Sequence, residues 1–186
     1  STNSGNSIND PYDSLVTLTS RFVMSPCRVN VMSDTDHIGG WNMADQQYVS
    51  IVGAGQTSMM FGGNEISGIS KYVTISNINF ANDWTAPTAQ ALKFSDSEGE
   101  HLIENIYTQN NTATTFIEFG TNCTSATADG VTTFGAKVAT IRNCDLTGST
   151  GGVLLPDLAA GDYAFIKVEN TQLTSITVGT GWYVIY

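Results

Sequence analysis

The sequence predicts an all-β protein in which short parallel strands coil into a stack of rungs. Three observations predict this fold: one phrase returns four times, apolar residues stand two apart within each copy, and an asparagine occupies the same place in every copy. The copies span residues 73–80, 101–108, 139–146 and 166–173, and their asparagines are Asn77, Asn105, Asn143 and Asn170. Repeats of this size are typical of arrays of stacked structural units.

The distances between the copies indicate one period with a single insertion. The asparagines are separated by 28, 38 and 27 residues. The long step therefore predicts the same coil with extra residues looped out around 121–135. Insertions in solenoids tend to fall on a functional face, so this loop is a candidate protrusion for binding a partner.

The spacing within each copy identifies strands rather than helices. Two residues before the asparagine, the four copies carry Ile75, Ile103, Ile141 and Val168. Apolar residues two apart predict strands with one buried face, whereas a helical repeat would place them three and four apart. One residue before the asparagine, where a side chain points outward, the last three copies carry Glu104, Arg142 and Glu169.

The repeated asparagine predicts a ladder at a turn. A side-chain amide can bond the same residue one rung away, and asparagine tolerates the left-handed conformation of a sharp turn. The phrase with its turn asparagine resembles the right-handed parallel β-helix of the pectate lyase and phage tailspike group. Residues 48–57 resemble the opening coil of that group, with Gly53 in the asparagine's place. The resemblance covers residues 28–186 and implies a single-stranded right-handed parallel β-helix of about five to six short coils.

The chain divides into a short leading segment and one solenoid. Residues 1–26 are predicted to form an N-terminal arm and a capping segment, because the first eleven are almost all polar and the next alternate loosely. Residues 27–186 form the parallel β-helix domain. The stretch 176–186 is apolar and aromatic, and we expect it to cap the last coil or to pack against another subunit.

The charge balance restricts the partners. Seven basic residues stand against 17 acidic ones, for a net charge of −10. No basic patch is available for nucleic acid or for an anionic membrane surface, and an acidic polysaccharide is disfavoured as a ligand. The sequence holds no apolar run long enough to cross a bilayer, so we expect a soluble protein.

Cysteine usage predicts free thiols. Cys27, Cys123 and Cys144 are odd in number and widely spaced, which signals neither a disulfide framework nor a zinc site. Cys144 falls one residue after a ladder asparagine, where we expect a small buried thiol. Free thiols suit assembly in a reducing cytoplasm.

Metal and histidine sites have both a functional and a simpler interpretation. Two polar stretches, residues 34–37 and 96–100, carry carboxylates that could bind a cation. Solvated turns are the simpler explanation of both stretches, so we predict no metal or cofactor. We expect one histidine to lie hydrogen-bonded in the core rather than to act in catalysis. The residues concerned are Asp34, Asp36 and His37 in the first stretch, Asp96, Glu98 and Glu100 in the second, and His101.

The outward charges have a catalytic and a structural interpretation. A lyase would need an arginine base beside carboxylates, and Arg142 between Glu104 and Glu169 has that form, with rungs about 4.8 Å apart. The simpler interpretation, which we adopt, is a charge ladder that offsets two like charges. A glycosidase would need converging carboxylates. Its candidates, Asp83, Glu104, Asp145 and Glu169, are spread over different faces, so we predict no catalytic residue.

These observations lead to one function and one alternative. We predict a non-enzymatic structural or adhesive protein of a phage particle, a head-decoration (cement) protein or spike module on the virion surface that contacts capsid or tail proteins and is assembled in the host cytoplasm. The resemblance to tailspikes implies a homotrimer. The alternative is a tailspike fragment that binds or depolymerises a bacterial surface glycan, as a lyase or a glycosidase. Candidate contact residues for a ligand or partner are the three tryptophans, Trp41, Trp84 and Trp182.

Overall fold

A computed structural model describes most of the chain. It covers residues 26–32, 35–37, 42–45, 48–60, 63–67, 71–81, 90–95, 100–121 and 136–186, with the backbone alone for 35–37, 59–60 and 136. The predicted N-terminal arm before residue 26 and the insertion from 122 to 135 lie outside these residues, as do Trp41, Trp84, Cys123, Asp34, Asp83, Asp96 and Glu98.

The described residues form two parallel sheets and no helix. The nine-stranded long sheet runs in the order β1-β4-β7-β9-β11-β13-β15, with β5 beside β7 and β2 beside β5. Its strands are β1 (Cys27–Asn30), β2 (Thr35–His37), β4 (Val49–Val52), β5 (Ser58–Met60), β7 (Thr74–Ala81), β9 (His101–Gln109), β11 (Ala136–Arg142), β13 (Ala164–Glu169) and β15 (Trp182–Ile185).

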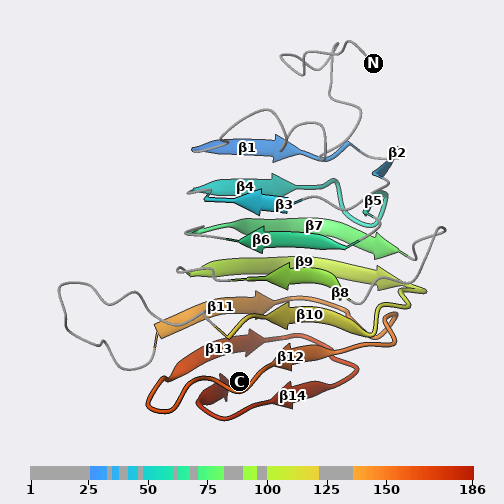
Figure 1. The fold of residues 1–186 in the computed structure, drawn as a ribbon. Coiled ribbons are helices and arrows are strands. Elements are labelled where there is room, and N and C mark those ends of the chain that lie inside the picture. The colour runs from blue at the N-terminus through green and yellow to red at the C-terminus, as the bar shows by residue number, and fades with distance from the viewer. Residues whose placement is uncertain are drawn as a thin grey trace.

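The six-stranded short sheet completes each coil. Its order is β14-β12-β10-β8-β6-β3. The strands are β3 (Asn42–Ala44), β6 (Asn64–Ser67), β8 (Gln90–Phe94), β10 (Thr115–Phe119), β12 (Val153–Leu155) and β14 (Ile176–Val178). Figure 1 shows the strands of the two sheets running in opposite directions and stacked along one axis, which is the arrangement of a parallel β-solenoid. This confirms the predicted all-β coiled fold.

The number of turns differs slightly from the prediction. About four turns separate Gly53 from Asn170, through Asn77, Asn105 and Asn143, fewer than the five to six coils expected. The strands before β4 and after β13 extend the two sheets at their ends. The right-handedness implied by the resemblance stays a prediction.

The core is a set of columns that run along the solenoid axis. Ile75 pairs with Ile103, Ile103 with Ile141, and Ile141 with Val168, so the predicted inward residues lie in one column. The first three side chains are 0 % exposed and Val168 is 4 % exposed. Burial of aliphatic side chains of this size is the main stabilising contribution of such a core, about 1.5 to 3 kcal/mol for each.

Aromatic rings fill the space between the two sheets. Phe94 and Phe119 stack with their ring centres 5.1 Å apart, and Phe80 meets Phe116 edge to face at 5.5 Å. All four rings are at most 1 % exposed. Such pairs stabilise a core beyond the area they bury, by about 0.5 to 1.5 kcal/mol for each pair.

Two further properties follow from the described residues. Cys27 and Cys144 are free thiols, as predicted, and Cys144 is buried. Within the part of the chain that the structure describes, there is no helix of the length and apolar character needed to span a membrane.

Candidate functional site

The four repeated asparagines lie at one corner of the solenoid, each in the left-handed region. Their φ values are 57°, 51°, 54° and 44° for Asn77, Asn105, Asn143 and Asn170. A single left-handed residue bends the chain sharply, and this conformation costs asparagine less free energy than it costs most other residues. Gly53, predicted to take the asparagine's place one coil earlier, donates its backbone N–H to Ser76 just as Asn143 donates to Glu169, but its φ is not positive, so it shares the register and not the left-handed conformation.

The side-chain amides form two hydrogen-bonded pairs. Asn105 Nδ2 donates to Asn77 Oδ1 over 3.0 Å, and Asn170 Nδ2 donates to Asn143 Oδ1 over 2.9 Å. No amide bond joins Asn105 to Asn143 among the described side chains. This is the rung step that contains the 38-residue interval, so the ladder is interrupted where the chain carries its extra residues.

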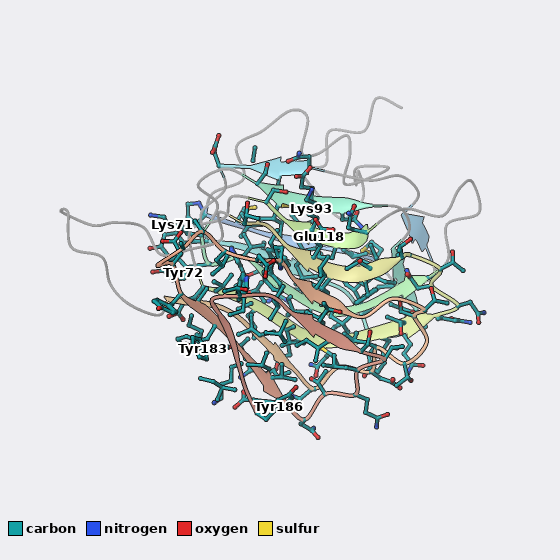
Figure 2. The ribbon with its side chains drawn as sticks, turned by 60° about the horizontal axis from the view of Figure 1, so that its bottom comes forward. Lys71, Tyr72, Lys93, Glu118, Tyr183 and Tyr186 are labelled. Atoms are coloured by element: carbon teal, nitrogen blue, oxygen red, sulfur yellow. The ribbon has the colours of Figure 1, made fainter. Side chains whose placement is uncertain are left out.

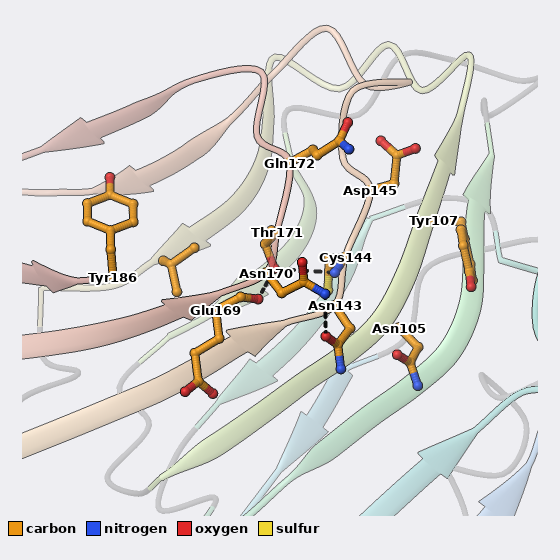
Figure 3. A pocket seen from close by; sticks show the side chains of 11 residues that line it. Asn105, Tyr107, Asn143, Cys144, Asp145, Glu169, Asn170, Thr171, Gln172 and Tyr186 are labelled. Atoms are coloured by element: carbon orange, nitrogen blue, oxygen red, sulfur yellow. Dashed lines mark hydrogen bonds between the residues drawn. The ribbon is translucent and has the colours of Figure 1, made fainter.

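A groove of about 810 Å³ runs along this corner. One wall consists of ladder asparagines and the other of a parallel column, Tyr107, Asp145 and Gln172, which is held by isolated bridges between neighbouring coils. Figure 3 shows Asn105, Asn143 and Asn170 facing the groove, with Tyr186 at its far end. The groove therefore has a mixed lining of polar side chains, two tyrosines and the less polar Val168 and Cys144.

The two carboxylates of the groove are held in the ionised form. Asp145 accepts hydrogen bonds from the hydroxyl and the backbone N–H of Thr147, which lower the pKa of its carboxyl. Lys167 Nζ lies 2.6 Å from Glu169 Oε1, and this ion pair lowers the pKa of the Glu169 carboxyl. A general acid near neutral pH needs a raised pKa, so neither carboxyl is prepared for that role.

The predicted charge ladder has a different pairing. Arg142 Nε lies 2.8 Å from Glu104 Oε1, and this bond raises the pKa of the guanidinium. Glu169, however, pairs with Lys167 on its own strand rather than with Arg142. Each acid of the column thus has its own cation. Glu169 acts on Arg142 only by charge–charge attraction, which helps to raise the pKa of the guanidinium.

A pair of tyrosines stacks on the outer face of the long sheet. The rings of Tyr48 and Tyr72 lie 5.1 Å apart at an angle of 14°. Both residues have positive φ, 58° and 53°, and their side chains are 59 % and 48 % exposed. Bulky residues seldom adopt this conformation, so these two positions hold an aromatic ring at the surface despite a backbone cost.

A small cavity of about 270 Å³ lies beside Tyr72. Its polar walls are Thr74, Thr140 and the ion pair of Glu100 with Lys137, whose charged atoms are 3.0 Å apart. One aromatic ring, two hydroxyls and one charge of each sign thus meet in a space near the lower limit of small-molecule sites, which is about 300 Å³. Glu100, considered above for calcium, is used in this pair.

The sequence contains a signal for the tyrosine pair, although no tyrosine was predicted as a contact residue. Tyr48 stands five residues before Gly53, and Tyr72 stands five residues before Asn77. Two aromatic residues at one offset from the ladder position predict neighbours on successive rungs. Glu100 and Phe165 occupy the same offset before Asn105 and Asn170.

His101 is a core residue. It is 2 % exposed, its Nδ1 accepts the backbone N–H of Val73 over 3.2 Å, and its ring lies 4.9 Å from that of Phe94. Burial lowers its pKa to about 4, so the ring is neutral over most of the physiological range. This position agrees with a packing role in the core, and the residue also contributes to the lining of the small cavity beside Tyr72.

Trp182 requires a correction as a contact residue. It is 5 % exposed and its ring centre lies 5.9 Å from that of Phe119, in the core. Its strand pairs Trp182 with Ala164, which is fully buried, so the side chain must point inward. Trp41 and Trp84 lie outside the described residues, and of Asp36 and His37 only the backbone, in β2, is described.

The described side chains hold no group of three or more histidine, cysteine, aspartate or glutamate residues arranged to bind a metal ion. The candidate surfaces are therefore the corner groove and the outer face of the long sheet with its tyrosines. Comparison with known proteins found no matching family model, no matching curated protein and no matching solved structure.

Proposed function

We propose that this chain is a structural or adhesive protein of a phage particle, a head-decoration protein or spike module that works as a homotrimer without catalysing a reaction. The observation that carries the proposal is the exposed aromatic surface on a rigid sheet. Tyr48, Tyr72 and Tyr183 are all about half exposed on one outer face. Tyrosine is enriched where proteins associate, because it supplies a large contact area at a low cost in side-chain entropy.

The solenoid supports such a role mechanically. Each coil bonds the next through continuous parallel ladders, such as the seven paired positions of β7 and β9. The outer residues are therefore fixed at the rung spacing of about 4.8 Å. A surface of this kind offers a partner a repeated, preorganised set of contacts, and little ordering entropy has to be paid on association. Capsid or tail proteins are the proposed partners on a virion.

Two measurements test this proposal. Light scattering coupled to size-exclusion chromatography is expected to give three times the chain mass. Electron microscopy of purified particles labelled with an antibody against this chain is expected to place it on the head or tail surface. A monomer at all concentrations, or its absence from purified particles, would refute the proposal.

A second candidate function is glycan binding, and the cavity beside Tyr72 favours it. A sugar ring stacks its apolar face on an aromatic ring while hydroxyl and charged groups bond its edge, and the cavity offers both. Binding to a glycan array that is lost in Tyr72→Asn would support this function. Release of oligosaccharides from a bacterial polysaccharide, abolished by Glu104→Gln or Glu169→Gln, would instead indicate a depolymerase.

A further inference from the structure

The outer face of the long sheet consists of three columns of side chains. The first column is Tyr48, Tyr72, Glu100, Lys137, Phe165 and Tyr183; the second is Arg28, Ser50, Thr74, Leu102, Thr140, Lys167 and Ile185; the third is Val52, Ser76, Glu104, Arg142 and Glu169. The strand register pairs the members of the second and third columns on successive rungs. In the first column Lys137, Phe165 and Tyr183 are paired in the same way, whereas Tyr48 stacks on Tyr72 and Glu100 meets Lys137 in an ion pair beside the register shift of β11. We call this surface the outer face.

The charges of the chain are unevenly divided between this face and the rest. The outer face carries four of the seven basic residues, Arg28, Lys137, Arg142 and Lys167, and three acidic ones, Glu100, Glu104 and Glu169, for a net of +1. The other described side chains carry two basic residues, Lys71 and Lys93, against six acidic ones, Asp45, Glu65, Glu118, Asp145, Asp157 and Asp162, for a net of −4.

The acids of the outer face are neutralised within the chain. Glu100 pairs with Lys137 at 3.0 Å, Glu104 with Arg142 at 2.8 Å and Glu169 with Lys167 at 2.6 Å. Among the residues that the structure describes, the partner of the fourth cation, Arg28, is a neutral amide, that of Asn30. The face therefore presents compensated charges and one excess cation, in a chain whose net charge is −10.

Exposed aromatic side chains lie in the same face. Tyr48, Tyr72 and Tyr183 are 59 %, 48 % and 58 % exposed. Figure 2 shows Tyr72 and Tyr183 along one edge of the solenoid, away from Lys93 and Glu118 of the short sheet. Tyrosine is enriched at protein interfaces, and charges that are paired within one copy avoid the like-charge contacts that oppose association.

We propose that the outer face is where two copies of this chain meet. The proposal rests on the homotrimer proposed above and names its contact surface. Copies with a net charge of −10 repel one another except where a neutral or positive surface takes part, and like-charge contacts are costly. A cyclic trimer repeats one heterologous contact, so the outer face of each copy meets a different surface of the next. The surface that it meets would come from the rest of the chain, where acidic residues are in excess and can attract the slightly positive outer face.

The aromatic part of the proposal is tested with the double variant Tyr48→Asn/Tyr72→Asn. Asparagine suits the left-handed backbone at both positions, so the rings are removed without new strain. Sedimentation velocity over a range of protein concentrations is expected to show at least a tenfold weaker trimer. Circular dichroism and thermal unfolding confirm that the monomer remains folded.

The electrostatic part has a matched control. Lys137→Gln on the outer face and Lys93→Gln on the short sheet remove one charge each from lysines of similar exposure, 32 % and 36 %, that both pair with a glutamate. Lys137→Gln is expected to weaken the trimer several-fold and Lys93→Gln to leave it within twofold. Raising the salt from about 0.05 to about 0.5 M is expected to weaken the wild-type trimer, since screening shortens the range of the attraction.

The outcomes separate the two proposals. A wild-type trimer whose affinity is unchanged in Tyr48→Asn/Tyr72→Asn, or that Lys93→Gln weakens as much as Lys137→Gln, overturns the outer face as the contact and leaves the homotrimer in place. A wild-type protein that is monomeric at all concentrations overturns both.

Discussion

The side-chain amide of Asn105 donates a 3.0 Å hydrogen bond to that of Asn77 on the neighbouring coil, and both residues are left-handed. Two contributions are therefore combined at this corner. One is the hydrogen bond between coils, and the other is the tolerance of asparagine for a backbone that other residues resist.

Substitution of Asn105 separates these two contributions. Asn105→Gly keeps the left-handed backbone and loses the amide, and we expect a loss of about 1 kcal/mol in the free energy of unfolding. Asn105→Ala also places a β-carbon in the left-handed conformation, at a further cost of about 1 to 2 kcal/mol. Urea unfolding measures both. Asn110 is left-handed as well, with no ladder bond among the described contacts, so Asn110→Gly is the control and is expected to change little. Equal losses for the two Asn105 variants would contradict the backbone argument.

His101 makes stability depend on pH. Burial lowers its pKa from 6.5 to about 4 in the folded chain. Above pH 6.5 the ring is neutral in both states. Between pH 6.5 and 4 His101 is protonated in the unfolded chain but stays neutral in the folded chain. The free energy of unfolding therefore falls as the pH falls, by on the order of 3 kcal/mol in all. Below about pH 4 this residue causes no further loss.

Chemical unfolding at a series of pH values tests this dependence. His101→Gln keeps an acceptor for the Val73 N–H and cannot titrate, so its stability is expected to change less between pH 6.5 and 4 than that of the wild type. The carboxyls of Asp145, Asp157 and Glu169 have lowered pKa values and add their losses at lower pH, equally in both proteins. Parallel curves for the two proteins over this range would refute the assignment.

The columns of the core were predictable from sequence because a period of two fixes which side chains face inward. Ile75, Ile103 and Ile141 lie two residues before a ladder asparagine, and that constant offset determines both their rung and their face. Trp182 could not be placed in this way. No ladder residue follows Asn170, so nothing in the sequence set the inward phase of the last strand.

The candidate sites were less predictable because outward side chains choose among several partners. The sequence predicts Arg142 between acids on both neighbouring rungs, and it does pair with Glu104. Glu169 instead pairs with Lys167, which stands two residues earlier on the same strand. Backbone register fixes columns, whereas long exposed side chains also reach along their own strand. The Tyr48 and Tyr72 stack, by contrast, was available from the constant offset and was missed.

Cys144 is expected to be protected from thiol reagents. Burial raises the pKa of its thiol to about 11, and its Sγ lies 3.1 Å from the carbonyl oxygen of Arg142. Since only the thiolate reacts, its modification is expected to be at least about tenfold slower than that of the half-buried Cys27. The measurement uses a Cys123→Ser variant and a chromogenic disulfide at pH 8. Denaturant should make both thiols react at once, and equal native rates would contradict the burial of Cys144.

Gly53 tests whether the ladder position is interchangeable between coils. The repeat pattern alone suggests that Gly53→Asn would extend the ladder by one rung. A β-carbon at Gly53, however, would overlap the backbone oxygen of Asn77 and approach the β-carbon of Ser58 to 2.8 Å. Because the backbone cannot move aside at low cost, Gly53→Asn and Gly53→Ala are both expected to destabilise the fold by about 3 kcal/mol.

Gly55 provides the comparison for this prediction. It has open space around a β-carbon but a φ of 100°, so Gly55→Ala meets backbone strain without a clash, at about 1 to 2 kcal/mol. Thermal and urea unfolding of the variants should therefore rank Gly53→Ala as the more damaging change. Stabilisation by Gly53→Asn would mean that the coil can shift to admit an amide there, and that the approach of Asn77 to Gly53 does not limit the residue at this corner.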